Sequence, residues 1–323
     1  MCYSAQIKAD YQRFVRQYGA RLSLNDFYDL FWRRLTDAKI QVPCGVEAAF
    51  ASPQSDEERA IQQLIAQHAA THVQALRAEQ DEQRERLAKA ELKLEAKPTK
   101  TAAENRRIAL KKIEALQQRI DALEHAQPSS DDVRIYPGSF VPVMVMEHGQ
   151  RIFRPMRYHC RPWYVPATFD QQYPGCYNAR RDSLKGFWRR LYGHCHGVVI
   201  LSAFYERVLR HLAEGRPPYP GERLGKALVE FRPDPAQDLL AACIWSRWTA
   251  PGEPDLLSFA IITQDPPPEI QAVGHDRCII PVQPEDLDAW LQPSPRDLAA
   301  QDAILDRHVE PHYGHSIVVE PGG

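Results

Sequence analysis

A long stretch without glycine is the feature that most constrains the fold of this 323-residue chain. Residues from about 55 to about 127 contain no Gly and one Pro, and they are rich in Ala, Glu, Gln, Lys and Arg. Apolar and amide side chains recur at spacings of three and four residues, the period of a coiled-coil seam. Pro98 interrupts the pattern, and Thr101 with Glu104 forms a capping box that starts a second helix. The stretch therefore predicts an antiparallel coiled-coil hairpin at residues 55–127.

The sequence outside the hairpin has a different composition. Short apolar runs separated by Pro, Gly and Asp are typical of strands, and they occur at Phe140–Met146, Gly197–Phe204, Leu239–Ile244, Leu257–Thr263 and Arg277–Val282. Helical spacing or caps predict four helices, at 5–19, 23–35, 182–191 and 284–291. We predict an α+β fold with a mainly antiparallel β core and flanking helices. Residues 1–54 and 128–323 form the two parts of this domain, and the hairpin interrupts it.

Composition excludes several classes of protein. The formal net charge is −2, so any contact with nucleic acid must come from a local patch. No run reaches the roughly 18 apolar residues that span a bilayer. Seven scattered cysteines without CxxC pairs predict a reducing, cytoplasmic location. Association with the nucleoid would follow only if the chain binds DNA. His194-Cys195-His196 and His159-Cys160 lack the spacing of paired zinc ligands, so we expect no metal and no cofactor.

The second residue has unusual chemistry once Met1 is removed. Methionine aminopeptidase removes an initiating Met that precedes a small residue, and Cys2 would then carry a free α-amine beside its thiol. An α-amine has a pKa of about 8, so its neutral fraction at pH 7 can attack an aldehyde to give an imine. The thiol can then close a five-membered thiazolidine ring. A cysteine at position 2 is weak evidence of function when it is taken alone.

Three polar residues lie beside predicted strand ends or turns: Asn178, Glu206 and His275. Each of them alone could be a cap, a surface carboxylate or a loop residue. Together with Cys2, the set resembles the SRAP family (SOS response-associated peptidases), whose members include sensors of abasic sites. The motifs that carry the resemblance are Met1-Cys2, Pro137-Gly138, Asn178-Ala179-Arg180, Phe204-Tyr205-Glu206 and His275-Asp276-Arg277.

The resemblance implies a reaction and a role for each of these residues. Cys2 would form a covalent thiazolidine cross-link with an abasic site in single-stranded DNA, after removal of Met1 by the aminopeptidase or by self-cleavage. Asn178 would hold the Cys2 terminus and the opened sugar. Glu206 would accept or donate protons during imine formation, and His275 would help to open the sugar ring or stabilise charge at the reacting carbon.

The resemblance also implies contacts with DNA phosphates. Arg180 and Arg277 would hold the phosphates that flank the lesion, because a guanidinium can bind phosphate bidentately. The family usually begins Cys-Gly-Arg, and that Arg contacts DNA, whereas this chain has Ser4 at the same position. We expect Lys8 or Arg157 to supply the missing contact.

A basic and aromatic segment agrees with a DNA-binding role. Residues 151–190 contain nine Lys or Arg, two Asp and nine aromatic residues, one of which is Trp163. A basic groove with stacking aromatics is what single-stranded nucleic acid requires. An ordinary core with a basic rim would have the same composition.

Other interpretations stay open. The chain could be a cysteine peptidase that cleaves its own N-terminus and other peptides, and an internal Cys–His pair would be a further variant of this reading. It could also be a non-catalytic scaffold whose hairpin binds a partner. The hairpin itself could be a solvated arm, a self-association surface, or a contact with a protein or with nucleic acid.

Overall fold

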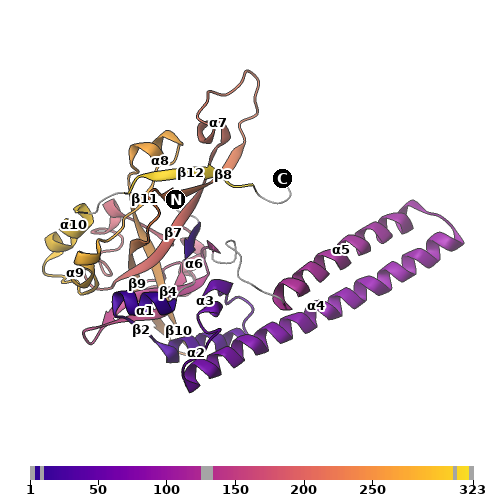
Figure 1. The fold of residues 1–323 in the computed structure, drawn as a ribbon, viewed down its shortest axis with the longest axis horizontal. Coiled ribbons are helices and arrows are strands. Elements are labelled where there is room, and N and C mark those ends of the chain that lie inside the picture. Colours follow the sequence, from indigo (N-terminus) through magenta and orange to yellow (C-terminus); the bar gives the residue numbers. More distant parts are fainter. Residues whose placement is uncertain (1–3, 8–10, 125–133, 308–310, 320–323) are drawn as a thin grey trace.

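The computed structural model describes residues 4–7, 11–124, 134–307 and 311–319. Within these ranges the chain forms a sheet of twelve strands with helices around it, and one long helical hairpin projects from this body (Figure 1). The predicted α+β fold with a mainly antiparallel sheet is confirmed. None of the helices in these ranges is both long enough and apolar enough to cross a membrane.

Five strands pair in a closed ring: β4 (Phe140–Glu147), β5 (Gln150–Tyr158), β7 (His196–Leu209), β9 (Leu239–Ala250) and β10 (Glu253–Gln264). The order around the ring is β4, β5, β10, β9, β7, and only the β5–β10 pair is parallel. Strands β4 and β7 come close together at Gly197, where a Cβ atom would lie 2.9 Å from Val143 Cγ1. Glycine is therefore required for the ring to close at this point.

Strand β7 changes its neighbours halfway along its length. Its first half lies between β4 and β9, and its second half lies between β1 (Ser4–Ile7) and β8 (Lys226–Pro233). Strand β1 also pairs with β3 (Arg134–Ile135), and β8 pairs with β12 (Tyr313–Ile317). Because β1 is antiparallel to β7, the start of β1 lies beside the C-terminal end of β7.

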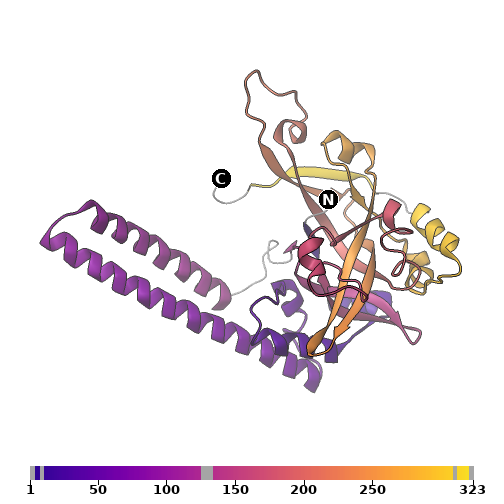
Figure 2. The ribbon, with the colours of Figure 1, turned by 180° about the vertical axis from the view of Figure 1, so that it is seen from behind.

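Shorter elements extend and cover the sheet. The remaining strands are β2 (Arg21–Leu22), β6 (Asn178–Arg180) and β11 (Cys278–Ile279). The helices of the body are α1 (Tyr11–Tyr18), α2 (Leu24–Arg34), α3 (Cys44–Ala48), α6 (Phe169–Gln172), α7 (Arg210–Ala213), α8 (Pro268–Ala272), α9 (Leu287–Leu291) and α10 (Leu298–Asp306). Figures 1 and 2 show α9 and α10 at one side of the body and α7 and α8 at one end of it.

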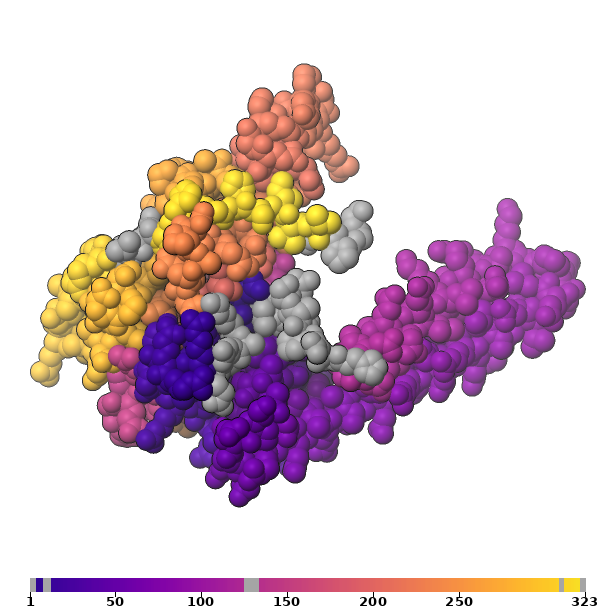
Figure 3. Space-filling view, viewed as in Figure 1, coloured from indigo at the N-terminus to yellow at the C-terminus, as the bar shows by residue number. Residues whose placement is uncertain are grey.

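The hairpin consists of α4 (Asp56–Ala96) and α5 (Lys100–Glu124). Val73, Leu76, Leu116 and Ile120 form a small apolar cluster between the two helices. The first turns of α4 pack on α2 instead, and Ile61 and Leu64 belong to the main core of the body. Beyond these turns the two helices stand away from the body as an arm (Figure 3).

Three predicted features differ from the structure. Residues 4–7 form β1, because pairing with β7 outweighs the helical spacing that the sequence has there, and the predicted first helix is reduced to α1. The predicted helix at 182–191 is a 3₁₀ turn (Arg181–Ser183) followed by further turns, interrupted by Gly186. The cap of α5 is Thr99, whose Oγ1 accepts from the backbone N–H of Ala102 at 3.2 Å, whereas Thr101 lies inside the helix.

Candidate active site

Strand register brings the predicted catalytic residues to one end of the ring. Strand β6 pairs in parallel with the C-terminal part of β10, so Asn178 lies near that end of β10. Strand β9 is antiparallel to both β10 and β7, so the C-terminal ends of β10 and β7 face the same way. Glu206 lies near the end of β7, and His275 precedes β11, which pairs with the last residues of β10.

Glu206 and His275 are in direct contact in a buried place. The distance from His275 Nε2 to Glu206 Oε1 is 3.4 Å, and the two side chains are only 7% and 6% exposed. Strand alternation explains the burial, because Glu206 shares the face of β7 that carries Phe204 and Val208, both members of the main core. The ring of Phe231 stacks loosely against the imidazole of His275, with 6.4 Å between the centroids and 29° between the ring planes. A buried carboxylate beside an imidazole is suited to proton transfer.

A glycine fixes the position of the histidine. Helix α8 ends just before Gly274, which has φ of +86°, and its backbone N–H donates to the Gln271 carbonyl. A Cβ at this position would also lie 2.4 Å from Leu212 Cδ1. The left-handed conformation turns the chain sharply after α8 and directs His275 toward Glu206.

Thr263 holds the amide of Asn178. The hydroxyl of Thr263 donates to Asn178 Oδ1 at 2.6 Å, and Thr263 itself is fully buried. This contact joins β6 to the C-terminal end of β10, where the two strands pair in parallel. The amide nitrogen on the other side of Asn178 is therefore directed away from β10.

Two polar atoms of this site lack hydrogen-bond partners among the described residues. Asn178 Nδ2 and His275 Nε2 are both buried, and neither makes a hydrogen bond of acceptable geometry. The His275–Glu206 contact is close enough for an ion pair but does not satisfy hydrogen-bond angles. An unsatisfied buried polar group costs about 1–3 kcal/mol, so these two atoms are candidates for contact with water or with a ligand.

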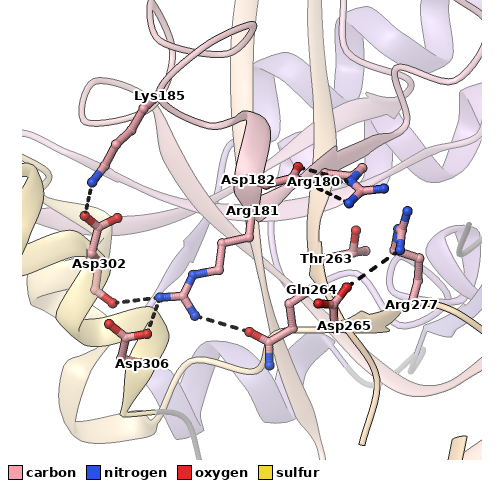
Figure 4. A pocket seen from close by; sticks show the side chains of 10 residues that line it. All are labelled: Arg180, Arg181, Asp182, Lys185, Thr263, Gln264, Asp265, Arg277, Asp302 and Asp306. Carbon is pink, nitrogen blue, oxygen red and sulfur yellow. Dashed lines mark hydrogen bonds and ion pairs between the residues drawn. The ribbon is translucent and has the colours of Figure 1, made fainter. Parts of the chain in front are cut away.

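The two predicted phosphate-binding arginines line one pocket of about 750 Å³ (Figure 4). Arg180 is paired with Asp182 at 2.5 Å, and Arg277 lies 3.9 Å from Asp265 across the pocket. On the α10 side, Arg181 is paired with Asp306. Lys185 and Asp302 are the other charged residues of the lining, so the pocket has four cations and four carboxylates. Its formal charges balance, and an incoming phosphate would have to displace a carboxylate from an arginine.

The remaining predicted residues have different surroundings. Arg157 is 17% exposed, and its guanidinium binds Asp170 at 2.8 Å and the His159 carbonyl. Trp163 is 54% exposed on a loop, where its ring packs edge-on against another aromatic ring. Cys2 and Lys8 lie outside the described residues.

The basic segment 151–190 is less basic in three dimensions than in sequence. Seven of its nine cations are paired with carboxylates, many of which come from distant parts of the chain. Arg154, for example, binds Asp26 and Glu147. Counting charges within the segment therefore overestimates its positive potential.

The structure reveals one cation that the sequence does not single out. Arg134 of β3 donates from Nε and Nη2 to Ser4 Oγ, at 3.0 and 2.7 Å. Its guanidinium also lies over the ring of Tyr205, 4.1 Å from the centroid. Among the described residues Arg134 has no carboxylate in ion-pair contact. No local motif indicates the contact between Arg134 and Ser4, because β1 and β3 are about 130 residues apart in the chain.

Four of the internal cysteines are poorly suited to nucleophilic catalysis. Burial raises the pKa of the Cys176 thiol to about 12 and that of the Cys195 thiol to about 11. Burial also raises the pKa of the Cys160 and Cys243 thiols well above the ordinary value. The thiolate is the reactive form, so these four residues are inert at neutral pH. The described residues contain no group of three or more His, Cys, Asp or Glu that could hold a metal ion.

The family described as SOS response associated peptidase (SRAP) matches residues 100–319, a range that contains Asn178, Glu206 and His275 but not Cys2. No curated protein matches the chain. Similar solved structures include a protein of Bordetella bronchiseptica, which is 16% identical with a TM-score of 0.45 over 58% of this chain and 88% of that one. A protein of Bacteroides thetaiotaomicron is 15% identical, with a TM-score of 0.44 over 58% and 78%.

A phage-related protein of Bordetella bronchiseptica is 19% identical, with a TM-score of 0.43 over 58% of this chain and 82% of that one. The family match alone covers more than half of the chain. It includes Asn178, Glu206 and His275 at one end of the ring, and the family is associated with abasic-site processing. The chain therefore belongs to the SRAP family, and this membership supports a function associated with DNA damage.

Proposed function

We propose that the chain forms a covalent cross-link between Cys2 and the aldehyde of an abasic site in single-stranded DNA. The observation that carries the proposal is the position of β1 relative to the buried pair. Ser4 is two residues after Cys2 and pairs with Tyr205, the residue that precedes Glu206. Two residues of chain span about 7 Å at most, so Cys2 is tethered no farther than this from Ser4, which pairs beside the part of β7 that carries Glu206.

The reaction needs proton transfers that this pair is equipped to make. The α-amine of Cys2 attacks the aldehyde carbon of the opened sugar and gives a carbinolamine, which loses water to form an imine. The Cys2 thiol then adds across the C=N bond, its proton passes to nitrogen, and a thiazolidine results. Glu206 accepts and returns protons in the first two steps. His275 donates to the sugar oxygen as the ring opens.

Asn178 has a positioning role in this proposal. Its amide oxygen is held by Thr263, and its buried amide nitrogen has no hydrogen-bond partner among the described residues. That N–H group is available to a hydroxyl of the opened sugar or to the Cys2 terminus. The free amine requires prior loss of Met1, which we assign to methionine aminopeptidase or to hydrolysis at this same site.

Arg134 is our candidate for the phosphate contact that an arginine at position 4 would make. Ser4 cannot bind a phosphate strongly, but it holds the Arg134 guanidinium through two hydrogen bonds. The cation is thereby fixed beside the start of β1. Arg157 is less suited to this contact, because Asp170 and the His159 carbonyl already occupy its donors.

A denaturing gel tests the proposal. The purified protein is mixed with a single-stranded oligonucleotide that carries one abasic site, and mass spectrometry first establishes that Met1 is absent. We expect a shifted band that survives denaturation, requires the lesion and disappears in Cys2→Ala. Cys195→Ala is the matched control, because this half-buried thiol has a raised pKa and its loss should leave the band unchanged.

Further variants separate chemistry from binding. Glu206→Gln and His275→Gln should slow the appearance of the band, whereas Arg134→Gln should weaken binding and leave the rate at saturating DNA unchanged. A protein with a free Cys2 amine that gives no band with abasic DNA would refute the proposal. Cleavage of peptides by the same sample would then favour the peptidase reading.

A further inference from the structure

The arm carries its charges in two segregated blocks. The distal arm, which we define as residues 84–112, contains ten Lys or Arg and four Asp or Glu. The rest of the two helices, residues 56–83 and 113–124, contains three Lys or Arg and nine Asp or Glu. A solvated coiled coil would be expected to intersperse the two signs, so the positive end of the arm suggests a polyanionic partner.

Many cations of the distal arm are not neutralised within the protein. Arg84, Lys89, Arg106 and Arg107 are paired with nearby carboxylates. Five lysines of the distal arm, all within the part of the chain that the structure describes, have no ion-pair partner: Lys93, Lys97, Lys100, Lys111 and Lys112. All five are exposed. The pocket that Arg180 and Arg277 line differs in this respect, because each of its cations has a carboxylate close by.

Three basic side chains near the end of α4 lie along one face of the helix. Arg86, Lys89 and Lys93 follow one another at spacings of three and four residues, which places them on the same side, and Lys97 follows the helix as its C-cap residue. Arg86, Lys89 and Lys93 also line a groove of about 450 Å³ against the start of α5. From Arg84 to Lys97 the chain extends about 20 Å. This length corresponds to about six base pairs of duplex DNA at 3.4 Å each.

The composition of the distal arm favours duplex over single-stranded DNA. Residues 84–112 contain no Phe, Tyr, Trp or His, so the stacking that single-strand binding requires is not available there. Leu92 and Leu110 are its large exposed apolar side chains, and two leucines are too few for an apolar docking patch. Contact with phosphates alone is strongest where charge density is highest, and a duplex carries one charge per about 1.7 Å.

We propose that the distal arm binds the phosphate backbone of duplex DNA next to the single-stranded segment that occupies the candidate active site. The body would hold the damaged strand, and the arm would hold the adjoining duplex without reading its sequence. This proposal rests on the proposed function for its DNA substrate. It concerns a different surface, whose binding can be measured without any covalent step.

A binding experiment with the full chain tests it. The probes are undamaged single strands that are extended by duplexes of about 6, 12 and 18 base pairs on either side. The arm variant replaces the five unpaired lysines with Gln, which keeps helix propensity. A charge-matched control replaces five exposed cations of the body with Gln: Arg21, Lys39, Arg223, Lys226 and Arg296. Both variants change the net charge by the same amount.

We expect the unmodified chain to bind a junction with about 12 base pairs of duplex at least ~10-fold more tightly than the single strand, and the arm variant to lose this gain. The slope of log affinity against log salt should fall by about 3 to 5 in the arm variant. The control variant should keep most of the affinity gained from the duplex and most of the salt slope. Equal affinity for tailed and untailed probes, or equal behaviour of the two variants, would overturn the proposal.

Measuring cross-linking and duplex affinity on the same unmodified chain distinguishes this proposal from the proposed function. If the unmodified chain, with Met1 absent, gives no cross-link but the duplex gain persists and depends on the five lysines, the proposed chemistry is wrong and the arm proposal stands. If cross-linking occurs and the gain is absent, the arm has another role, and an acidic protein surface is the next partner to examine.

Discussion

At the scale of single residues, the orientation of one amide depends on one hydroxyl. Asn178 lies on a strand of three residues and its side chain could rotate freely without a partner. The 2.6 Å hydrogen bond from Thr263 fixes which end of the amide faces the site. Because Thr263 is fully buried, no water can replace its hydroxyl without rearrangement.

We expect Thr263→Val to slow cross-linking by about fivefold while the fold is kept, because a neutral hydrogen bond contributes about 1 kcal/mol. Valine has the shape of threonine but cannot donate to Asn178, whereas Thr263→Ser retains the hydroxyl and should react nearly normally. Rates at saturating abasic DNA measure the effect. A Val variant as fast as the Ser variant would show that the amide needs no orientation.

The sequence identified individual site residues only where they belong to short motifs. Glu206 and His275 were singled out by adjacent residues, and the structure brings their side chains into contact. Thr263 and Arg134 were missed, because their partners are 85 and 130 residues away and no local pattern reports such contacts. The same limit explains why the basic character of residues 151–190 was overestimated.

At the scale of elements, helix α4 belongs to two parts of the molecule. Its first turns contribute Ile61 and Leu64 to the main core, and only later turns pack on α5. Gln80 then bridges the two helices, donating to the Ile113 carbonyl at 3.3 Å and to Gln117 Oε1 at 3.0 Å. The helices are therefore close enough beyond Gln80 to be joined by a short linker.

Two deletions should have different effects on stability. Replacing residues 84–112 with a short Gly-rich linker removes the distal arm alone, and the urea midpoint of the body should hardly change. Deleting residues 55–127 also uncovers the core at Ile61 and Leu64, and should cost more than about 4 kcal/mol, since each buried Leu or Ile contributes about 2–5 kcal/mol. Similar midpoints for both deletions would contradict this assignment.

Helices and strands were predicted from the sequence where their hydrophobic pattern was regular. The hairpin was predicted because its 3-4 spacing continues over many turns, and the structure has α4 and α5 there. Apolar runs such as those within β4 and β9 were also recognised. Strands β5 and β8 were missed, since charged residues alternate with apolar ones in QRIFRPMRY and KALVEFRP. The boundaries of the predicted domains stay a prediction.

At the scale of the whole molecule, a buried histidine makes folding sensitive to acid. His196 lies in the core, where Nε2 accepts from the Gly193 N–H and Nδ1 contacts the Trp290 carbonyl. Burial lowers the pKa of His196 to about 3. Burial also lowers the pKa of His159, with the same sign. The folded state therefore disfavours protonation of both His196 and His159.

The free energy of unfolding should therefore fall as pH decreases from about 6.5 toward 3. The unfolded chain binds a proton at His196 in this window and the folded protein does not, so the loss approaches about 1.4 kcal/mol per pH unit for one histidine. Urea unfolding at several pH values measures the slope. His196→Gln should flatten it, whereas substitution of the exposed His194 by Gln should leave it as it is. Stability that does not change in this window would contradict the expectation.

The closed ring of strands bears on how copies of the chain behave when they are crowded. An unpaired strand edge is a template on which another chain can add a strand, and long flat edges promote aggregation. The five ring strands have neighbours on both sides. In the described ranges, the strands with a single neighbour have two to five residues each: β2, β3, β6, β11 and β12. Such short edges offer a second copy few unpaired backbone groups, so the folded protein should resist sheet-to-sheet aggregation at high concentration.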